Sequence, residues 1–239
     1  PQLQRSILSK SYTDFRNGKS VKYALESMHE IDAAYTKNTY LASDNVRSAL
    51  ATGLSKKGIF VEYRLQGSVE TNTHIKLHSD IDVLVFTDKF HIVEPPITVS
   101  NYYKGDPLAD LRELRVECFN VLHSIYKEVD NSNSKCIQVF PTNPKRKVDV
   151  VPSNWINTNE YIQTNREIHR GVHVYNKDEH SRQKDFPFLH IFNINEKDKH
   201  TIGSVKDLIR LLKTLKADSD TEIKLSSFEI SSIVYDMPN

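Results

Sequence analysis

Three aspartates and one glycine–serine pair are the residues of this 239-residue sequence whose types and spacing could do chemistry. Asp80 and Asp82 stand in the run DIDVLVF, and Asp149 stands in KVDVVP. Residues two apart on a strand leave the same face, so Asp80 and Asp82 are expected to be neighbours. Neighbouring carboxylates raise each other's pKa unless a cation lies between them, and Mg²⁺ prefers such oxygen ligands. The pattern therefore predicts a divalent-metal site.

Each part of this pattern also has an ordinary structural explanation. A DxD on a strand is commonly a solvated face, Gly-Ser after a strand is commonly a turn, and Asp149 could be a surface or capping residue. The combination favours function, because the aspartates have apolar neighbours and buried, unpaired carboxylates are costly. A third carboxylate would complete a two-metal site, which stabilises the attacking and leaving oxygens in displacement at phosphorus. The Gly67-Ser68 turn offers backbone N–H groups and a hydroxyl to a triphosphate.

The elements that must position these residues alternate between helical and β periodicity. We expect helices in the first sixty residues, the second of them capped by Ser43 or Asp44. We expect strands over 59–67, 80–86, 136–140 and 147–152, a helix over about 108–129, and helices again over 203–239. Between 160 and 190 the sequence is less regular, with short β-like runs at 161–163 and 172–175.

This order of elements predicts an α+β fold rather than strict βαβ alternation. The natural division is a catalytic core with N-terminal helices over 1–160 and a mainly helical lobe over 161–239. Because little helix remains after residue 230, we expect either a compact variant or a chain trimmed at its ends.

Composition restricts the class of protein. The 32 basic and 31 acidic side chains give a net charge of +1, which argues against a protein that coats nucleic acid. No apolar run is long enough for a transmembrane helix, and the first ten residues lack the apolar region of a signal peptide. The two cysteines, Cys118 and Cys136, have no CxxC spacing and predict a reduced, cytoplasmic protein.

The runs LQGSVETNTHIKLHSDIDVLV (65–85), KVDVVPS (147–153), RLLKTLK (210–216) and LSSFEI (225–230) resemble a known family. They are similar to the cGAS/DncV-like nucleotidyltransferases of bacteria (CD-NTases), in the superfamily typified by DNA polymerase β. The resemblance implies a polymerase β-like core, with a mixed sheet backed by helices, and a C-terminal helical nucleotide-binding lobe. It implies Gln66, Gly67 and Ser68 at the nucleotide phosphates, Asp80, Asp82 and Asp149 on two Mg²⁺ ions (Mn²⁺ can substitute), and Lys213 with Ser227 at the end of the triphosphate.

Two basic segments allow alternative interpretations. Lys206, Arg210 and Lys213 are spaced to share one helix face, which either binds a triphosphate or is the solvated side of an amphipathic helix. The run from Lys145 to Lys147 either meets a nucleotide or is a solvated turn.

The resulting hypothesis is a Mg²⁺-dependent enzyme that joins nucleoside triphosphates into a cyclic di- or oligonucleotide. A ribose hydroxyl attacks the α-phosphate in line and pyrophosphate leaves. The resemblance places this activity in antiphage (CBASS-type) signalling, with a product-sensing effector protein as partner. The alternatives are a toxin-like nucleotidyltransferase that modifies tRNA or protein, a synthetase of linear oligonucleotides, and a non-catalytic relative. The intact aspartate trio argues against the last of these.

Overall fold

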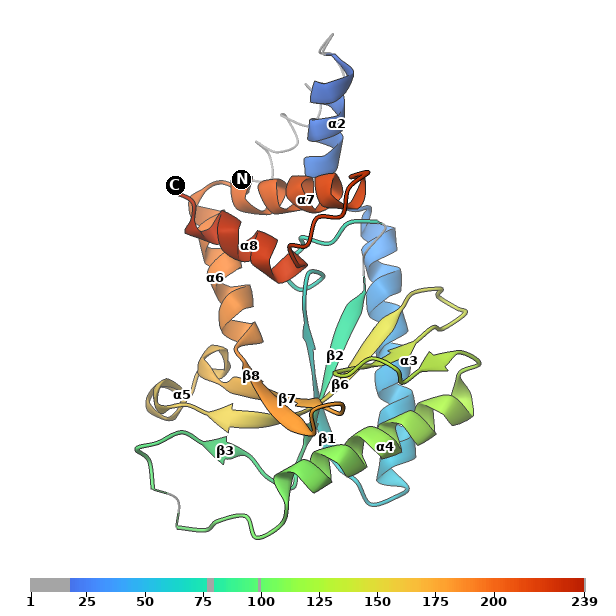
Figure 1. Cartoon of the computed structure of the whole chain (residues 1–239), viewed down its shortest axis with the longest axis vertical. Coiled ribbons are helices and arrows are strands. Elements are labelled where there is room, and N and C mark those ends of the chain that lie inside the picture. Colours follow the sequence, from blue (N-terminus) through green and yellow to red (C-terminus); the bar gives the residue numbers. More distant parts are fainter. Residues whose placement is uncertain (1–17, 77–79, 99, 239) are drawn as a thin grey trace. The chain divides into compact units, whose positions relative to one another are not determined.

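A computed structural model describes residues 18–76, 80–98 and 100–238 of the chain (Figure 1). The helices are α2 (Lys19–Met28), α3 (Ala33–Ser55), α4 (Pro107–Ile125), α5 (Asn159–Thr164), the 3-10 helix η1 (Glu167–His169), α6 (Pro187–His200), α7 (Ser204–Ala217) and α8 (Ser227–Asp236). The strands are β1 (Val61–Gln66), β2 (Ile81–Thr87), β3 (Ile92–Val93), β4 (Val129–Asp130), β5 (Ile137–Val139), β6 (Val148–Asn157), β7 (Gly171–Asn176) and β8 (Ser181–Asp185). None of the described helices combines the length and the apolar character that a membrane span requires.

The chain divides into two compact units. The first contains the described residues of Pro1–Asp32, Thr71–His78 and Asn193–Asn239, and the second contains those of Ala33–Glu70 and Ser79–Phe192. The predicted boundary between residues 160 and 161 falls inside the second unit. The reason is that β7 and β8 continue the hydrogen-bonded sheet beyond β6, a long-range pairing that periodicity does not reveal.

A mixed sheet organises the second unit, as predicted. Its main order is β1-β2-β6-β5-β4, and β3 and β7 also pair with β6. Strands β2 and β6 run parallel, whereas β1 is antiparallel to β2, and β5 and β7 are antiparallel to β6. The two strands that carry the aspartates are therefore direct neighbours at the centre of the sheet.

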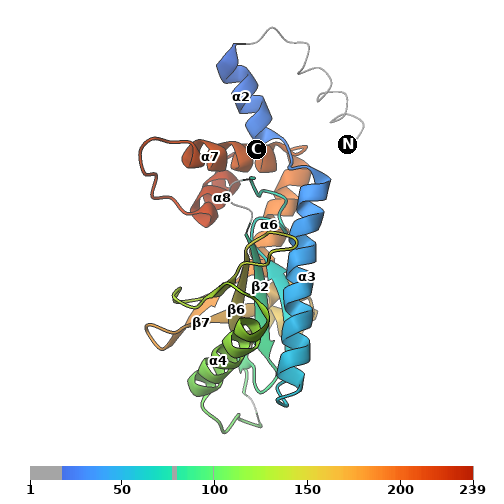
Figure 2. The same cartoon turned by 90° about the vertical axis from the view of Figure 1, so that its right-hand side faces the viewer.

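One face of this sheet is covered by α3 and α4 (Figure 2). Their apolar side chains pack on alternate residues of β2 and β6, and the contacting residues include Leu50, Leu54, Leu111, Leu122, Val83, Val85, Val148 and Val150. Each such side chain contributes about 1.5–3 kcal/mol when it is fully buried. The intervening residues of β2 and β6 occupy the opposite face, where Leu84, Phe86, Val151 and Trp155 form a second apolar cluster. Asp82 and Asp149 directly adjoin residues whose side chains point toward α3 and α4. Because successive side chains of a strand point to opposite faces, the two aspartates lie on the second face.

Two local expectations are wrong. Helix α3 begins at Ala33, so Ser43 and Asp44 lie inside it and cap nothing; Ser43 Oγ instead donates to the carbonyl of Tyr40 (2.8 Å). The segment 161–163 is helical, within α5. Thr158 caps that helix by accepting the N–H of Tyr161 (3.1 Å), and this cap prevails over the β preference of the segment.

The first unit has a small helical core of its own. Ile194 of α6, Val205 and Ile209 of α7, and Val234 of α8 are buried together. Helix α8 begins with a reciprocal cap, in which Ser226 Oγ accepts the N–H of Glu229 (3.1 Å) and the Glu229 carboxylate accepts the N–H of Ser226 (2.6 Å). This reciprocal cap fixes the helix start immediately before Ser227.

Candidate active site

The register of β1, β2 and β6 aligns three of the predicted site residues across the sheet. Gln66 is paired with Asp82, and Asp82 is paired with Asp149. Paired residues on neighbouring strands lie about 5 Å apart and share a face of the sheet. Asp80, two positions before Asp82, is directed to this same face by the strand alternation. We call Asp80, Asp82 and Asp149 the carboxylate cluster.

Gly67 sits against this cluster and is conformationally required there. Its φ of +87° is in the region that favours glycine. A Cβ at this position would lie only 2.5 Å from Asp82 Oδ2. The backbone of the turn can therefore approach the carboxylate only because residue 67 has no side chain. Ser68 follows directly in this turn and is partly exposed.

The carboxylate cluster carries more negative charge than its surroundings compensate. Burial, together with Asp149 and Asp80, raises the pKa of Asp82 to about 7, and Lys147 only partly opposes the shift. Burial also raises the pKa of Asp149. The Asp149 Oδ1 atom is buried and has no hydrogen-bond partner among the described residues. Such an orphaned acceptor in a group of hard oxygen donors is what a divalent cation would satisfy.

Lys147 also lies in the candidate site, although nothing in the sequence separates it from the other two residues of its basic run. Its Nζ lies 2.7 Å from Asp80 Oδ2 and 3.4 Å from Asp149 Oδ2. Among the described residues, no three His, Cys, Asp or Glu side chains form a group ready to hold a metal ion. Asp80 and Asp149 instead each direct an oxygen at Lys147. Strand alternation could have identified this lysine, because it stands two positions before Asp149 and so shares its face.

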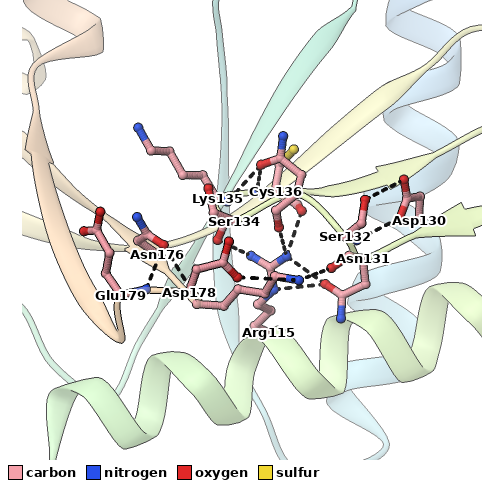
Figure 3. A network of polar contacts seen from close by, with 12 residues as sticks. Arg115, Asp130, Asn131, Ser132, Ser134, Lys135, Cys136, Asn176, Asp178 and Glu179 are labelled. Carbon is pink, nitrogen blue, oxygen red and sulfur yellow. Dashed lines mark hydrogen bonds and ion pairs between the residues drawn. The ribbon is translucent and has the colours of Figure 1, made fainter.

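A buried arginine fixes the segment that leads into β5 beside the cluster (Figure 3). Arg115 of α4 donates to Asn131 Oδ1 (2.7 and 3.0 Å) and to the carbonyls of Asn133 (2.6 Å), Ser134 (3.0 Å) and Cys136 (2.9 Å). Cys136 is thereby held near the carboxylates: burial, then Asp149 and Asp82, raise the pKa of its thiol to about 12. A thiol with so high a pKa is not a nucleophile at neutral pH.

The predicted triphosphate ligands on the helices belong to the first unit. Lys213 Nζ is buried and donates to the carbonyl of Thr73 (2.9 Å), and burial lowers the pKa of this lysine to about 8. Arg210 is 1% exposed and donates to the carbonyls of Met28 (2.7 Å) and Asn72 (2.5 Å) and to Asp207. Arg210 therefore lies on the interior side of α7 and ties together the segments of its own unit.

The structure groups the predicted residues in two sets. The second unit holds Gln66, Gly67, Ser68 and the carboxylate cluster, and the first unit holds Lys213 and the exposed Ser227. The assignment of Lys213 and Ser227 to a triphosphate stays a prediction.

Comparison with known protein families identifies the superfamily. The family described as "Nucleotidyltransferase domain" matches residues 48–170, which include β1, β2 and β6 and so the whole carboxylate cluster. The match thus falls on the strands whose geometry defines the site.

Curated relatives are similar over almost the whole chain. A "c-di-GMP synthase" of a Lachnospiraceae bacterium is 36% identical over 91% of this chain and 69% of the relative. A "Cyclic dinucleotide synthase CdnE" of Yersinia aleksiciae is 33% identical over 95% of this chain, which spans only 61% of that longer protein.

Solved structures agree with these relatives. A STING-associated CdnE c-di-GMP synthase from Flavobacteriaceae sp. superposes with a TM-score of 0.78 at 30% identity, over 91% of this chain and 67% of the other. The corresponding synthase from Capnocytophaga granulosa gives a TM-score of 0.75 at 35% identity, over 98% of this chain and 70% of the other. On the strength of the fold, the carboxylate cluster and these similarities, the chain belongs to the bacterial CD-NTase family of polymerase β-like nucleotidyltransferases.

Proposed function

We propose that this chain is a cyclic dinucleotide synthase. The observation that carries the proposal is the row formed by Gln66, Asp82 and Asp149, with Gly67 packed against Asp82. With divalent cations bound to its carboxylates, a row of this kind would place the phosphates and the attacking hydroxyl on one side of the sheet. Support for a cyclic product comes from the relatives, of which several bear the name c-di-GMP synthase.

The proposed reaction consists of two nucleotidyl transfers. In each, a ribose hydroxyl oxygen forms a bond to an α-phosphorus while the bond from that phosphorus to the bridging oxygen of the β-phosphate breaks. One pyrophosphate leaves per transfer, and the hydroxyl proton is released. The first transfer gives a linear dinucleotide, and the second closes the ring.

Asp80, Asp82 and Asp149 are the residues that would hold divalent cations, with Mg²⁺ as the expected ion and Mn²⁺ as a substitute. When bound, such ions neutralise the charge of the triphosphate and lower the pKa of the attacking hydroxyl. The donor set fits this role, because it consists of carboxylate oxygens and includes the unpartnered Asp149 Oδ1.

The residues of the chain have two roles in this proposal: some bind and orient the triphosphate, and one accepts a proton. The Gly67–Ser68 turn offers backbone N–H groups and a hydroxyl to the phosphates. Asp149 is proposed to accept the proton of the attacking hydroxyl. Lys213 and Ser227 are proposed to hold the end of the triphosphate, which requires Lys213 to give up the carbonyl of Thr73.

The names of the relatives suggest the substrate and the setting. GTP is the first nucleotide to test, because relatives at 29–36% identity are c-di-GMP synthases. The structures described as STING-associated support an effector protein that senses the product, and hence a role in antiphage signalling.

The test is product analysis. The protein is incubated with each of the four labelled nucleoside triphosphates and Mg²⁺, the mixture is treated with phosphatase, and the product mass is measured. The expected result is a phosphatase-resistant product with the mass of a cyclic dinucleotide, absent with Asp82→Asn. A phosphatase-sensitive product identifies a linear synthetase, and label that appears only on added tRNA or protein identifies a modifying enzyme. Either result contradicts the proposal.

A further inference from the structure

Lys147 is bound to the carboxylate cluster by two contacts at once. The Nζ atom pairs with Asp80 Oδ2 at 2.7 Å and with Asp149 Oδ2 at 3.4 Å. Residue 147 directly precedes β6, so the lysine and Asp149 leave the same face two positions apart. One ammonium thus joins carboxylates from the β2 side and from β6.

The environment distinguishes this lysine from an ordinary surface cation. The side chains of Lys147 and Asp149 are only 23% and 13% exposed. The neighbouring Lys145 is exposed and has no ion pair with a described carboxylate. Lys145 and Lys147 therefore lie in the same loop, but of the two only Lys147 contacts the carboxylate cluster.

We propose that Lys147 is the internal counter-cation of the carboxylate cluster and that it gives up Asp80 and Asp149 to a divalent cation. The inference rests on the metal site of the proposed function, and it adds a residue that sets the metal affinity of that site.

Charge and flexibility support this exchange. Three neighbouring carboxylates hold up to three negative charges, of which one ammonium compensates one. A divalent cation would compensate more of this charge, and it would give a partner to Asp149 Oδ1, which has no hydrogen-bond partner among the described residues. The four-carbon stem of lysine lets the ammonium leave by rotation about its own bonds, without movement of the strand. The protein is thus stabilised before a cation binds, at the expense of affinity for that cation.

Metal binding is measured directly, without nucleotide and without turnover. The Mn²⁺ dissociation constant is obtained by electron paramagnetic resonance of free Mn²⁺ for the wild type, Lys147→Gln, Lys147→Arg and the matched control Lys145→Gln. We expect Lys147→Gln to bind Mn²⁺ about tenfold more tightly, because the competing charge is gone. Lys147→Arg and Lys145→Gln should remain within about twofold of the wild type.

Thermal unfolding gives the reciprocal measurement. In EDTA, Lys147→Gln should unfold at a lower temperature than the wild type, and saturating Mn²⁺ should remove the difference. Unchanged or weaker Mn²⁺ binding by Lys147→Gln would overturn the inference, because Lys147 would then be neutral toward the metal or would assist it. So would a wild-type protein that binds no Mn²⁺.

A measurement on the wild type covers the case in which Lys147→Gln does not fold. Acylation of lysines by a succinimidyl ester is followed by peptide mass spectrometry, with and without Mg²⁺. Lys147 should react faster when Mg²⁺ is present, while Lys145 serves as the internal reference. Equal protection of Lys147 in both conditions counts against the exchange.

These results are independent of product formation. If the wild type makes no cyclic dinucleotide but Lys147→Gln binds Mn²⁺ more tightly, the counter-cation role stands and the proposed function fails. If the wild type makes the product and Mn²⁺ affinity is insensitive to residue 147, only the inference fails.

Discussion

Two groups of charged side chains, the carboxylate cluster of the second unit and the cations Arg210 and Lys213 of the first, find partners within the protein to different degrees. In the second unit, Asp82 and Asp149 lie in a crowded group of carboxylates in which Asp149 Oδ1 has no partner within the described structure. In the first unit, Arg210 and Lys213 donate to backbone carbonyls, and Arg210 also donates to Asp207. Buried groups that find their partners within the protein stabilise the fold, whereas groups left short of partners are available to a ligand.

The largest effect that follows from this difference is expected on activity at Asp82. Asp82→Asn removes a charged oxygen ligand from the centre of the row while it preserves the shape of the side chain. We expect the rate of product formation to fall by about 10³-fold or more, with the far-ultraviolet circular dichroism unchanged. Retention of wild-type activity by this variant would remove the carboxylate cluster from the mechanism.

In the first unit, we expect substitution of a buried cation to change the stability of the fold. Arg210→Ala leaves the carbonyls of Met28 and Asn72 without their donor, and we expect it to lower the free energy of unfolding by about 3 kcal/mol. Urea denaturation measures the change. Arg210→Lys keeps the charge but has fewer donors, so it should fall between the wild type and the alanine variant. If Arg210→Ala were as stable as the wild type, the buried Arg210 would not stabilise the first unit. The proposed difference between the two units would then be wrong.

Gly67 tests how closely the backbone must approach the carboxylates. Gly67→Ala places a Cβ 2.5 Å from Asp82 Oδ2 at a φ of +87°, and we expect activity to fall by about 30-fold, or about 2 kcal/mol. Gly58→Ala is the matched control, because its φ of +72° imposes the same backbone strain but no atom lies within 4 Å of the added Cβ. Equal activity losses in the two variants would attribute the effect to strain alone.

The sequence predicts one of these regions better than the other. The shared face of Asp80 and Asp82 and the turn at Gly67-Ser68 are predictable, because alternation within a strand and the turn preference of glycine are local properties. That Asp82 lies beside Asp149 depends on the parallel pairing of β2 and β6, which only the family resemblance implied. Lys147 followed the same alternation but belonged to a run of three basic residues, and such runs are usually solvated.

The roles of the cations in the first unit could not be predicted in the same way. Helical spacing places Arg210 and Lys213 on one face of α7, but it does not tell which residues cover that face. Their partners Asn72 and Thr73 are about 140 positions away in the sequence. The first unit is assembled from three separate segments, and periodicity within a segment does not show which segments pack together.

The smallest predicted effect is a pH-dependent gain in stability. The pKa of Asp82 is about 7 in the folded protein and about 3.9 in an unfolded chain, so the folded state binds the proton more tightly. The stability contributed by the protonated carboxyl is therefore fully present below about pH 4 and is lost as the pH rises through about 7. Asp82→Asn lacks this loss, and in EDTA at pH 8 its free energy of unfolding should exceed that of the wild type by about 1–2 kcal/mol. At pH 4 the two proteins should unfold alike. If Asp82→Asn raised the free energy of unfolding equally at pH 4 and pH 8, removal of the Asp82 charge would not explain the increase. The charged carboxylates of the second unit would then not destabilise the folded protein.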